Sequence, residues 1–316
     1  MTLRMFRVEP ANSGAVVHDP CTGLTHWAQI KGLDPGRVWL DDTVVGGWAV
    51  ARPQELDRAM PVSVCWSPIV RCNLSCPHCL DDKSVHEADQ AQRRQVADRI
   101  AAAGVLGVDI SGGEPLLLAD LGDLAGRLIR GGCVVSVTSN GWRLARRAAE
   151  LSGRVDAVRV SLDGPDAGRH DRWRGHGSFD RAVAGLRACA ARGVPAQIQT
   201  VLMSSNGQDA QDMVDLAATE GVYGITFLQL LPIGKAVRLP GDQLLGDAEA
   251  ARVVAGLDVP EGLRVRLRQR QAADGFTVVR ADGTVWGNTG GAHAISRRRL
   301  LRDRADLALE GADGSA

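Results

Sequence analysis

Three cysteines in one short segment are the residues best suited to chemistry in this chain. Cys72, Cys76 and Cys79 form a C-x3-C-x2-C pattern. Thiolates are soft ligands that bind zinc, copper(I) or iron–sulfur clusters. A structural zinc site needs a fourth cysteine or histidine, and His78 would have to share the tight loop with two of the cysteines. Three thiolates alone can hold a [4Fe–4S] cluster that leaves one iron open to a substrate or cofactor.

A second segment with chemical potential is the turn DISGGEP at residues 109–115. Gly112 and Gly113 have no Cβ, so the backbone there can approach a ligand closely. Glu114 offers a carboxylate that can accept a hydrogen bond from an ammonium group. This turn follows a β-branched run, so we expect a ligand-binding loop at the end of a strand.

Six β-branched runs are predicted to be the strands that position these loops. The strand candidates are residues 62–67, 107–111, 133–138, 157–162, 196–202 and 224–230. Between them, apolar residues recur at helical spacing, as at Leu121, Leu124 and Leu128, and Ser178 is a candidate helix N-cap. Alternating strands and helices predict an α/β protein with a partial (β/α)6 barrel. Its chemistry is expected at the C-terminal ends of the strands.

The two ends of the chain depart from this repeat. Residues 1–60 contain short strand candidates separated by Pro-Gly and Gly-Gly turns, and they are predicted to form a small β-rich appendage. Residues 61–236 are predicted to form the barrel core. Residues 237–316 are predicted to form an extension with a short C-terminal β element and a frayed tail.

Two segments of this extension are rich in arginine. Arginines at positions 264, 266, 268 and 270 alternate mostly with apolar residues. The alternation indicates a strand with one charged face, which is either an edge strand protected against aggregation or a surface that reads an anionic substrate. The run from Arg297 to Arg304 is predicted to be a solvated helix face.

Together, the cysteine pattern and the GGEP turn resemble the radical SAM superfamily. The resemblance spans about residues 61–236 and includes the TSNG segment at 138–141. It implies that the three cysteines hold a [4Fe–4S] cluster and that S-adenosylmethionine (SAM) binds the open iron. The positions that it implies for contacts with SAM are His78, Gly112, Gly113, Glu114, Ser139, Asn140, Ser161 and Arg174.

The resemblance also implies a role for several of these residues. The turn that ends in Glu114 would bind the methionine amino group. The TSNG residues would face the ribose and carboxylate, and Ser161 and Arg174 are candidates for the carboxylate. His78 stands where the family pattern has an aromatic residue. No catalytic side chain is assigned.

The segment from Ser161 to Phe179 resembles one branch of the superfamily, which includes the molybdenum-cofactor cyclase and peptide maturases with SPASM or twitch extensions. Residues 276–288 resemble the hairpin of such an extension, yet no cysteine follows Cys189. An auxiliary cluster of the usual kind therefore cannot form in this segment, which casts doubt on mechanisms that need a second cluster.

The resemblance implies an enzyme that generates a 5′-deoxyadenosyl radical and takes hydrogen from its substrate. We expect that substrate to be a ribosomally made peptide in natural-product maturation. The alternative is an epimerase or dehydrogenase acting on a small molecule such as a sugar or aminoglycoside, and a remote alternative is a zinc-binding protein without catalysis. An electron donor such as flavodoxin or ferredoxin is the expected partner.

Composition argues against several other classes of protein. The chain has 316 residues with 37 basic and 37 acidic side chains, and this balance argues against nonspecific nucleic-acid binding. No apolar stretch is long enough to span a membrane, and the N-terminus lacks a signal-peptide core, so we expect a cytoplasmic protein. Cys133 and Cys189 are predicted to be small core residues, whereas Cys21 and Cys65 stay open as hydrogen donors.

Overall fold

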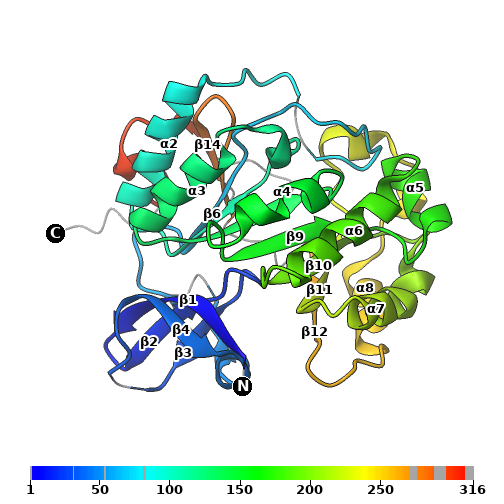
Figure 1. Cartoon of the computed structure of the whole chain (residues 1–316), viewed down its shortest axis with the longest axis horizontal. Coiled ribbons are helices and arrows are strands. Elements are labelled where there is room, and N and C mark those ends of the chain that lie inside the picture. The colour runs from blue at the N-terminus through cyan, green and yellow to red at the C-terminus, as the bar shows by residue number, and fades with distance from the viewer. Residues whose placement is uncertain are drawn as a thin grey trace.

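The computed structural model describes residues 2–30, 32–52, 55–80, 83–270, 276–287 and 297–309. Its main feature is a curved sheet with the strand order β12-β11-β10-β9-β8-β7-β6-β13-β14-β15 (Figure 1). The strands from β6 to β12 run parallel: β6 Ser63–Trp66, β7 Gly107–Ile110, β8 Val134–Ser139, β9 Ala157–Ser161, β10 Ala196–Leu202, β11 Gly224–Gln229 and β12 Arg264–Arg268.

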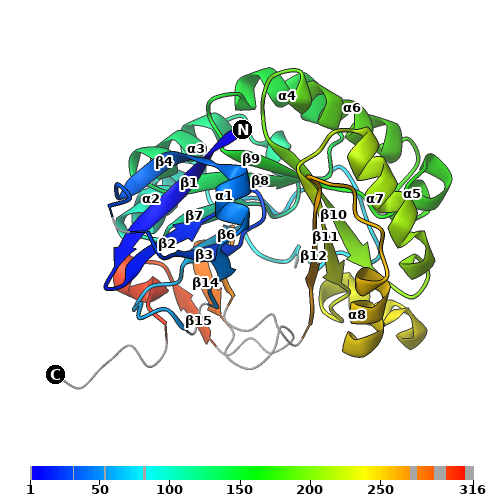
Figure 2. The same cartoon turned by 90° about the horizontal axis from the view of Figure 1, so that it is seen from below.

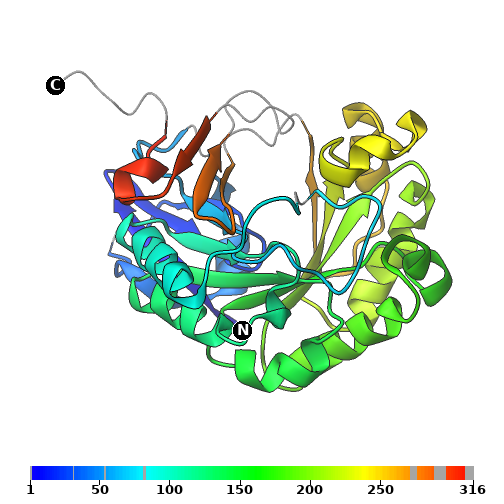
Figure 3. The same ribbon diagram turned by 90° about the horizontal axis from the view of Figure 1, so that it is seen from above.

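Helices follow the strands and cover the outer face of the sheet (Figure 3). They are α2 Gln90–Ala102, α3 Leu121–Arg130, α4 Leu144–Leu151, α5 Ala167–Arg174, α6 Ser178–Ala190, α7 Ala210–Thr219 and α8 Asp247–Ala255. In the described part of the chain, the strand–helix unit repeats six times, from β6–α2 to β11–α8. The predicted partial (β/α)6 barrel is confirmed, and each of the six strand candidates contains or overlaps a strand.

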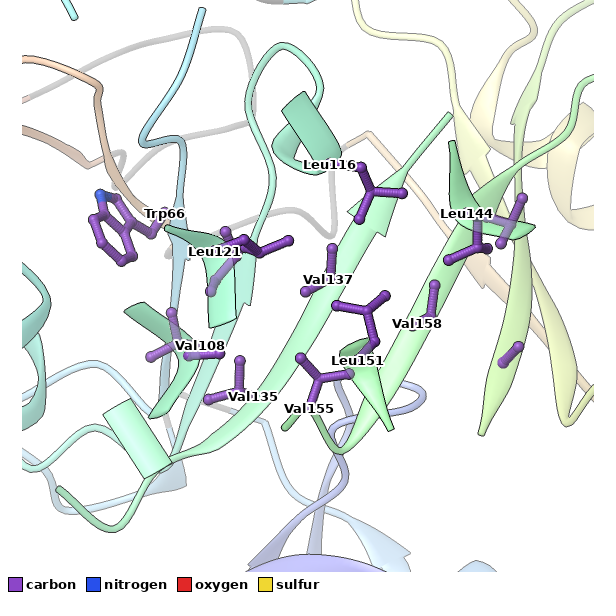
Figure 4. Close-up of a cluster of buried hydrophobic side chains, with 14 of the residues drawn as sticks. Trp66, Val108, Leu116, Leu121, Val135, Val137, Leu144, Leu151, Val155 and Val158 are labelled. Carbon is purple, nitrogen blue, oxygen red and sulfur yellow. The ribbon is translucent and has the colours of Figure 1, made fainter. Parts of the chain in front are cut away.

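The hydrophobic core lies between the sheet and the helices. Alternate strand residues such as Val108, Val135 and Val158 are buried there with Leu121 and Leu151 from the helices (Figure 4). Burying each large apolar side chain contributes about 1.5–3 kcal/mol. On each strand, the residues next to these valines face the opposite, concave side of the sheet, because side chains alternate along a strand. That side is polar, and the candidate site lies along it.

Short 3-10 turns complete the loops at the strand ends. They are η2 Pro115–Leu117, η3 Gly207–Asp209, η4 Gly234–Arg238, η5 Gly241–Gln243 and η6 Arg304–Leu307. No helix in the described ranges combines the length and the apolar character needed to cross a bilayer.

The N-terminal residues form a separate antiparallel sheet of order β4-β1-β2-β3-β5. Its elements are β1 Leu3–Ala11, β2 Gly14–His18, β3 Thr25–Ala28, β4 Gly36–Asp41, α1 Asp42–Gly46 and β5 Ala49–Val50. Figure 2 shows this sheet lying against one end of the barrel. Sequence analysis did not identify β1, whose buried Phe6 and Val8 alternate with charged residues.

The C-terminal strands join the main sheet at both of its edges. β12 pairs with β11, while β13 (Thr277–Val279) pairs in parallel with β6 and is followed by β14 (Thr284–Gly287). The predicted helix face in the second arginine run is wrong, because Arg297–Leu300 forms strand β15 on β14. The predicted frayed tail includes residues 310–316, which lie outside the described residues, as does position 288 of the hairpin.

The start of α6 also differs from the prediction. Gly177, with a left-handed φ of 74°, is the N-cap, and Ser178 is the first helical residue. The Asp171 carboxylate on α5 accepts hydrogen bonds from the N–H groups of Gly177 and Phe179 and from the hydroxyl of Ser178. The cap therefore comes from the preceding helix, which local spacing does not reveal.

Candidate metal and cofactor site

The three cysteines lie in the loop that follows β6 and crosses above the concave side of the sheet (Figure 3). Cys72, Cys76 and Cys79 are free thiols and half-buried. Within the described ranges, no three histidine, cysteine or acidic side chains converge as ligands of one metal ion. In a [4Fe–4S] cluster each thiolate binds a different iron. Three cysteines in one partly exposed loop are a donor set that suits such a cluster.

The cysteine loop is docked on the GGEP turn. The N–H of Gly113 donates to the carbonyl of Ile69 at 2.7 Å, and the N–H of Glu114 donates to the carbonyl of Arg71 at 2.9 Å. A Cβ on Gly112 would lie 2.3 Å from the Ile69 oxygen, and one on Gly113 would lie 2.1 Å from the Arg71 oxygen. The two glycines are therefore needed for the close approach of the cysteine loop. From the sequence, we expected this space to allow the close approach of a ligand.

Glu114 ties the same turn to the end of β8. Its carboxylate is fully buried and accepts from the Leu116 N–H, the Ser139 hydroxyl and the Asn140 N–H, at 2.8–3.0 Å. Burial raises the pKa of Glu114, and these three donors oppose the rise. A carboxylate has about four acceptor sites, so one remains for a further donor. Ser139 and Glu114 thus brace the strand ends.

Asn140 connects β8 to the first cysteine. Its Nδ2 donates to Asn73 Oδ1 at 3.0 Å and lies 3.7 Å from Cys72 Sγ. The Leu74 N–H also points at this sulfur, at 3.4 Å. Hydrogen bonds to cysteine sulfur are among the factors that set the reduction potential of an iron–sulfur cluster. Burial raises the pKa of the Cys72 thiol, and the Leu74 and Asn140 donors oppose that rise, so they would stabilise this sulfur as a cluster ligand.

His78 belongs to a buried charged group centred on Asp163, just beyond β9. Its Nε2 lies 3.1 Å from Asp163 Oδ2, and the Arg174 guanidinium donates to the same oxygen. The Val201 N–H donates to the other oxygen at 2.8 Å. Burial alone would raise the pKa of Asp163, but Arg174 and His78 hold it far below its usual range. The charged carboxylate fixes His78 above the strand ends.

One atom of this group has no protein partner. Nδ1 of His78 is buried and has no hydrogen-bond partner among the described residues. The ring packs edge-on against Trp173, with centroids 5.9 Å apart. A buried polar atom without a partner costs about 1–3 kcal/mol. This position would gain from a bound molecule with a polar group, as expected for a cofactor beside the cysteine loop.

Sequence reasoning missed two residues that hold the loop. Asp163 was recognised only as part of a motif, although its position between a strand end and Arg174 was a usable signal. Lys235 on η4 donates through Nζ to Ser75 Oγ at 2.8 Å and through its N–H to the Cys79 carbonyl at 2.9 Å. These contacts close the loop from the opposite side of the barrel mouth.

The concave face itself is polar. Ser161 lies on it at the end of β9, and Cys65 Sγ lies 3.0 Å from Ser111 Oγ. Of the lone cysteines, Cys133 and Cys189 are fully buried in the core, as predicted. Cys21 is fully buried between β2 and β3, where its carbonyl accepts a hydrogen bond from Arg159 of the barrel, whereas Cys65 is brought to the concave face.

Comparison with known proteins agrees with the family resemblance seen in the sequence. Residues 66–218 match the family described as "Radical SAM superfamily". The pre-heme d1 synthase of Dinoroseobacter shibae is 31% identical over 66% of this chain and 52% of its own length. The mycofactocin maturase MftC of Mycolicibacterium smegmatis is 30% identical over 67% of this chain and 56% of its own length. The chain thus spans about half the length of the curated relatives it matches.

Solved structures share the fold at low identity. The crystal structure of Streptococcus suis SuiB bound to precursor peptide SuiA superposes with a TM-score of 0.63 at 12% identity, covering 90% of this chain and 82% of that one. Native anSMEcpe with bound AdoMet gives a TM-score of 0.57 at 18% identity, covering 72% and 74%.

Proposed function

Because the chain belongs to the radical SAM superfamily, we propose that it is an enzyme that holds a [4Fe–4S] cluster on Cys72, Cys76 and Cys79, binds SAM and modifies a peptide. When bound, the cluster and SAM supply a 5′-deoxyadenosyl radical that can take a hydrogen atom from the substrate. The observation that carries the proposal is the docking of the cysteine loop on the GGEP turn at the C-terminal ends of parallel strands.

The chain's own residues would hold and orient these groups. Glu114 and Asn140 fix the strand ends beside Cys72, and Asp163 holds His78 with its Nδ1 unpartnered. Ser161 and Arg174 are the proposed contacts for the SAM carboxylate. Arg174 is paired with Asp163, which positions its guanidinium near Cys76. Gly112 and Gly113 would contact SAM through their backbone atoms.

A peptide is the proposed substrate. The similarity to a maturase, MftC, supports it, as does the shared fold with a protein crystallised with its precursor peptide. A second candidate is a small molecule, favoured by the similarity to pre-heme d1 synthase. The arginines on the concave face would suit a small molecule that is an anion. A flavodoxin or ferredoxin is the proposed electron donor.

The test is anaerobic reconstitution with iron and sulfide, followed by SAM and dithionite. We expect 5′-deoxyadenosine in chromatography with mass detection. Replacing Cys72, Cys76 and Cys79 together by Ala should abolish it, whereas Cys189→Ala in the core should keep it. Absence of 5′-deoxyadenosine from cluster-loaded protein would overturn the proposal. A mass change in a short peptide encoded beside this gene would support the peptide, and turnover of a small acid alone would contradict it.

A further inference from the structure

The arginine face of β12 is directed to the concave side of the sheet. Val265 and Leu267 pack against the hydrophobic core, so Arg264, Arg266 and Arg268 lie on the opposite face. The last of them, Arg268, is paired in register with Leu228 of β11, near the C-terminal edge where the cysteine loop crosses. The strand is both an edge strand and a row of cations on the concave side.

Two of these arginines are occupied by the N-terminal part of the chain. Arg264 donates to the backbone carbonyl of Asp42 at 2.9 Å and lies 3.4 Å from its carboxylate. Arg266 donates to the carbonyl of Thr22. Their contacts fasten the N-terminal sheet to the barrel, which accounts for these two positions without a ligand.

Arg268 differs from both. Among the described residues, its guanidinium has no carboxylate within ion-pair distance and no hydrogen-bond acceptor. The side chain is exposed, so a molecule in solution can reach it. On the concave face, Asp109, Arg159 and Arg266 interact with it electrostatically.

The carboxylate of Asp109 is already engaged. It accepts from the hydroxyls of Ser136 and Thr138 at 2.8–3.0 Å and lies 3.3 Å from the Arg159 guanidinium. Asp19, which faces Arg266, is bound by Arg4. Asp109 is thus paired with Arg159, and Asp19 near Arg266 is paired with Arg4. Arg268 is left without a carboxylate of its own among the described residues.

The polar groups beside Arg268 are neutral. Burial raises the pKa of the Cys65 thiol to about 11, so the thiol stays protonated at neutral pH. It shares a 3.0 Å contact with Ser111 Oγ. Neither side chain supplies an anion that would neutralise the arginine.

We infer that Arg268 binds a carboxylate group of the substrate on the concave face of the barrel. A guanidinium presents paired N–H donors that match the two oxygens of a carboxylate. The inference rests on the proposed function, because the bound carboxylate is part of a substrate only if the chain is an enzyme. The carboxylate belongs either to an acidic side chain of a peptide or to a small carboxylic acid.

The test measures binding to the reconstituted holoenzyme by anaerobic titration calorimetry. The probes are glutarate, its neutral diamide glutaramide, and the blocked tripeptides acetyl-Ala-Glu-Ala-amide and acetyl-Ala-Gln-Ala-amide. We expect an acid probe to bind and its neutral counterpart not to bind. Because a hydrogen bond to a charged group contributes about 1.5–3 kcal/mol, Arg268→Met should weaken binding about tenfold or more, and Arg268→Lys should weaken it less.

The matched control is Arg130→Met, an exposed arginine at the end of α3, which should bind the probes as the wild type does. Thermal melting establishes that each variant is folded. Arg268-dependent binding of the glutamate tripeptide supports a peptide carboxylate, and Arg268-dependent binding of glutarate alone supports a small acid. The inference is overturned if no acid probe binds, if Arg268→Met binds as tightly as wild type, or if the neutral probes bind equally well.

This readout does not depend on cleavage of SAM. A protein that shows Arg268-dependent binding but forms no 5′-deoxyadenosine would refute the proposed function alone. A protein that forms 5′-deoxyadenosine but binds no acid probe would refute the anion site alone.

Discussion

Asp163 is the residue on which the buried charges beside the cysteine loop depend. It is fully buried and compensates Arg174, whose side chain is 11% exposed. Asp163→Asn keeps the shape but leaves a buried guanidinium without a counter-charge. We expect a loss of about 3 kcal/mol or more in the free energy of unfolding, measured by urea titration.

The control for this change is Asp212→Asn. Asp212 also pairs with an arginine, but its side chain is 53% exposed. Its replacement should change stability by less than about 1 kcal/mol, because exposed ion pairs contribute little. Equal effects of the two substitutions would show that burial of the Asp163–Arg174 pair is irrelevant.

Gly113 has a role that can be separated from folding of the barrel. Gly113→Ala places a Cβ against the Arg71 carbonyl, and relief of such overpacking costs about 1–3 kcal/mol. Since the loop must move, we expect less iron and sulfide per chain after reconstitution than in wild type. Gly126→Ala, within α3, should reconstitute fully, because its Cβ meets only the flexible end of Arg130. Full iron content in Gly113→Ala would contradict the docking.

At the scale of elements, the link between α5 and α6 decides how the second half of the barrel is held. The Asp171 carboxylate caps α6 from the preceding helix. Asp171→Ala should destabilise the protein by about 1–2 kcal/mol in thermal or urea unfolding. Asp215→Ala, on the exposed face of α7, should have a much smaller effect. An unchanged unfolding midpoint for Asp171→Ala would refute the capping role.

Elements were predictable where the signal is local. The runs that became β6 to β11 are β-branched and short, and the cysteine spacing and the GGEP turn lie directly after two of them. Pairings between distant segments were not predictable, such as β13 beside β6 or the cap of α6 by Asp171. Strand β1 was missed because its buried face includes Arg4 beside Phe6 and Val8, and because charged Arg7 and Glu9 flank Val8.

In the candidate site, too, the features with a local sequence signal were predictable and those that depend on distant segments were not. The spacing of Cys72, Cys76 and Cys79 was enough to predict three thiols in one loop after a strand, and the structure has that loop after β6. Their role as cluster ligands stays a prediction. The sequence did not reveal that the two glycines of the GGEP turn receive the cysteine loop, or that Glu114 is occupied by three protein donors. Both facts depend on which backbone lies opposite, and that is set by the three-dimensional packing.

At the scale of the whole molecule, the N-terminal sheet is bound to the barrel by polar contacts that are buried or partly buried. Arg37 donates to Asp156 at 2.7 and 2.8 Å, and Arg159 donates to the carbonyls of Pro20 and Cys21. His18 is buried at this contact, where a Cβ on Gly107 would lie 2.3 Å from its Nε2. The sheet is therefore part of the same packed structure as the barrel.

His18 makes this contact sensitive to acid. Desolvation lowers the pKa of His18 from 6.5 to about 4, against the attraction of Asp19, and Arg159, His26 and Arg266 lower it further. Between about pH 6.5 and 4, His18 binds a proton in the unfolded chain but stays neutral in the folded chain. The free energy of unfolding is therefore unaffected by His18 above pH 6.5 and decreases as the pH falls towards 4. The loss reaches about 3 kcal/mol.

Urea unfolding at pH 7.5, 6 and 5 measures this effect. The free energy of unfolding should fall with pH in the wild type, and the fall should be smaller in His18→Asn. His176→Asn, at an exposed histidine, should keep the wild-type dependence. A wild-type dependence in His18→Asn would show that other groups are responsible.

The most direct test of the central claim is electron paramagnetic resonance of the anaerobically reconstituted, dithionite-reduced protein, with and without SAM and with metal analysis of the same sample. The account predicts about four irons per chain, the signal of a reduced [4Fe–4S] cluster, and a change of that signal when SAM is added. Cys76→Ala should lose all three. Zinc in place of iron, or a Cys76→Ala protein with an unaltered cluster signal, would contradict the account.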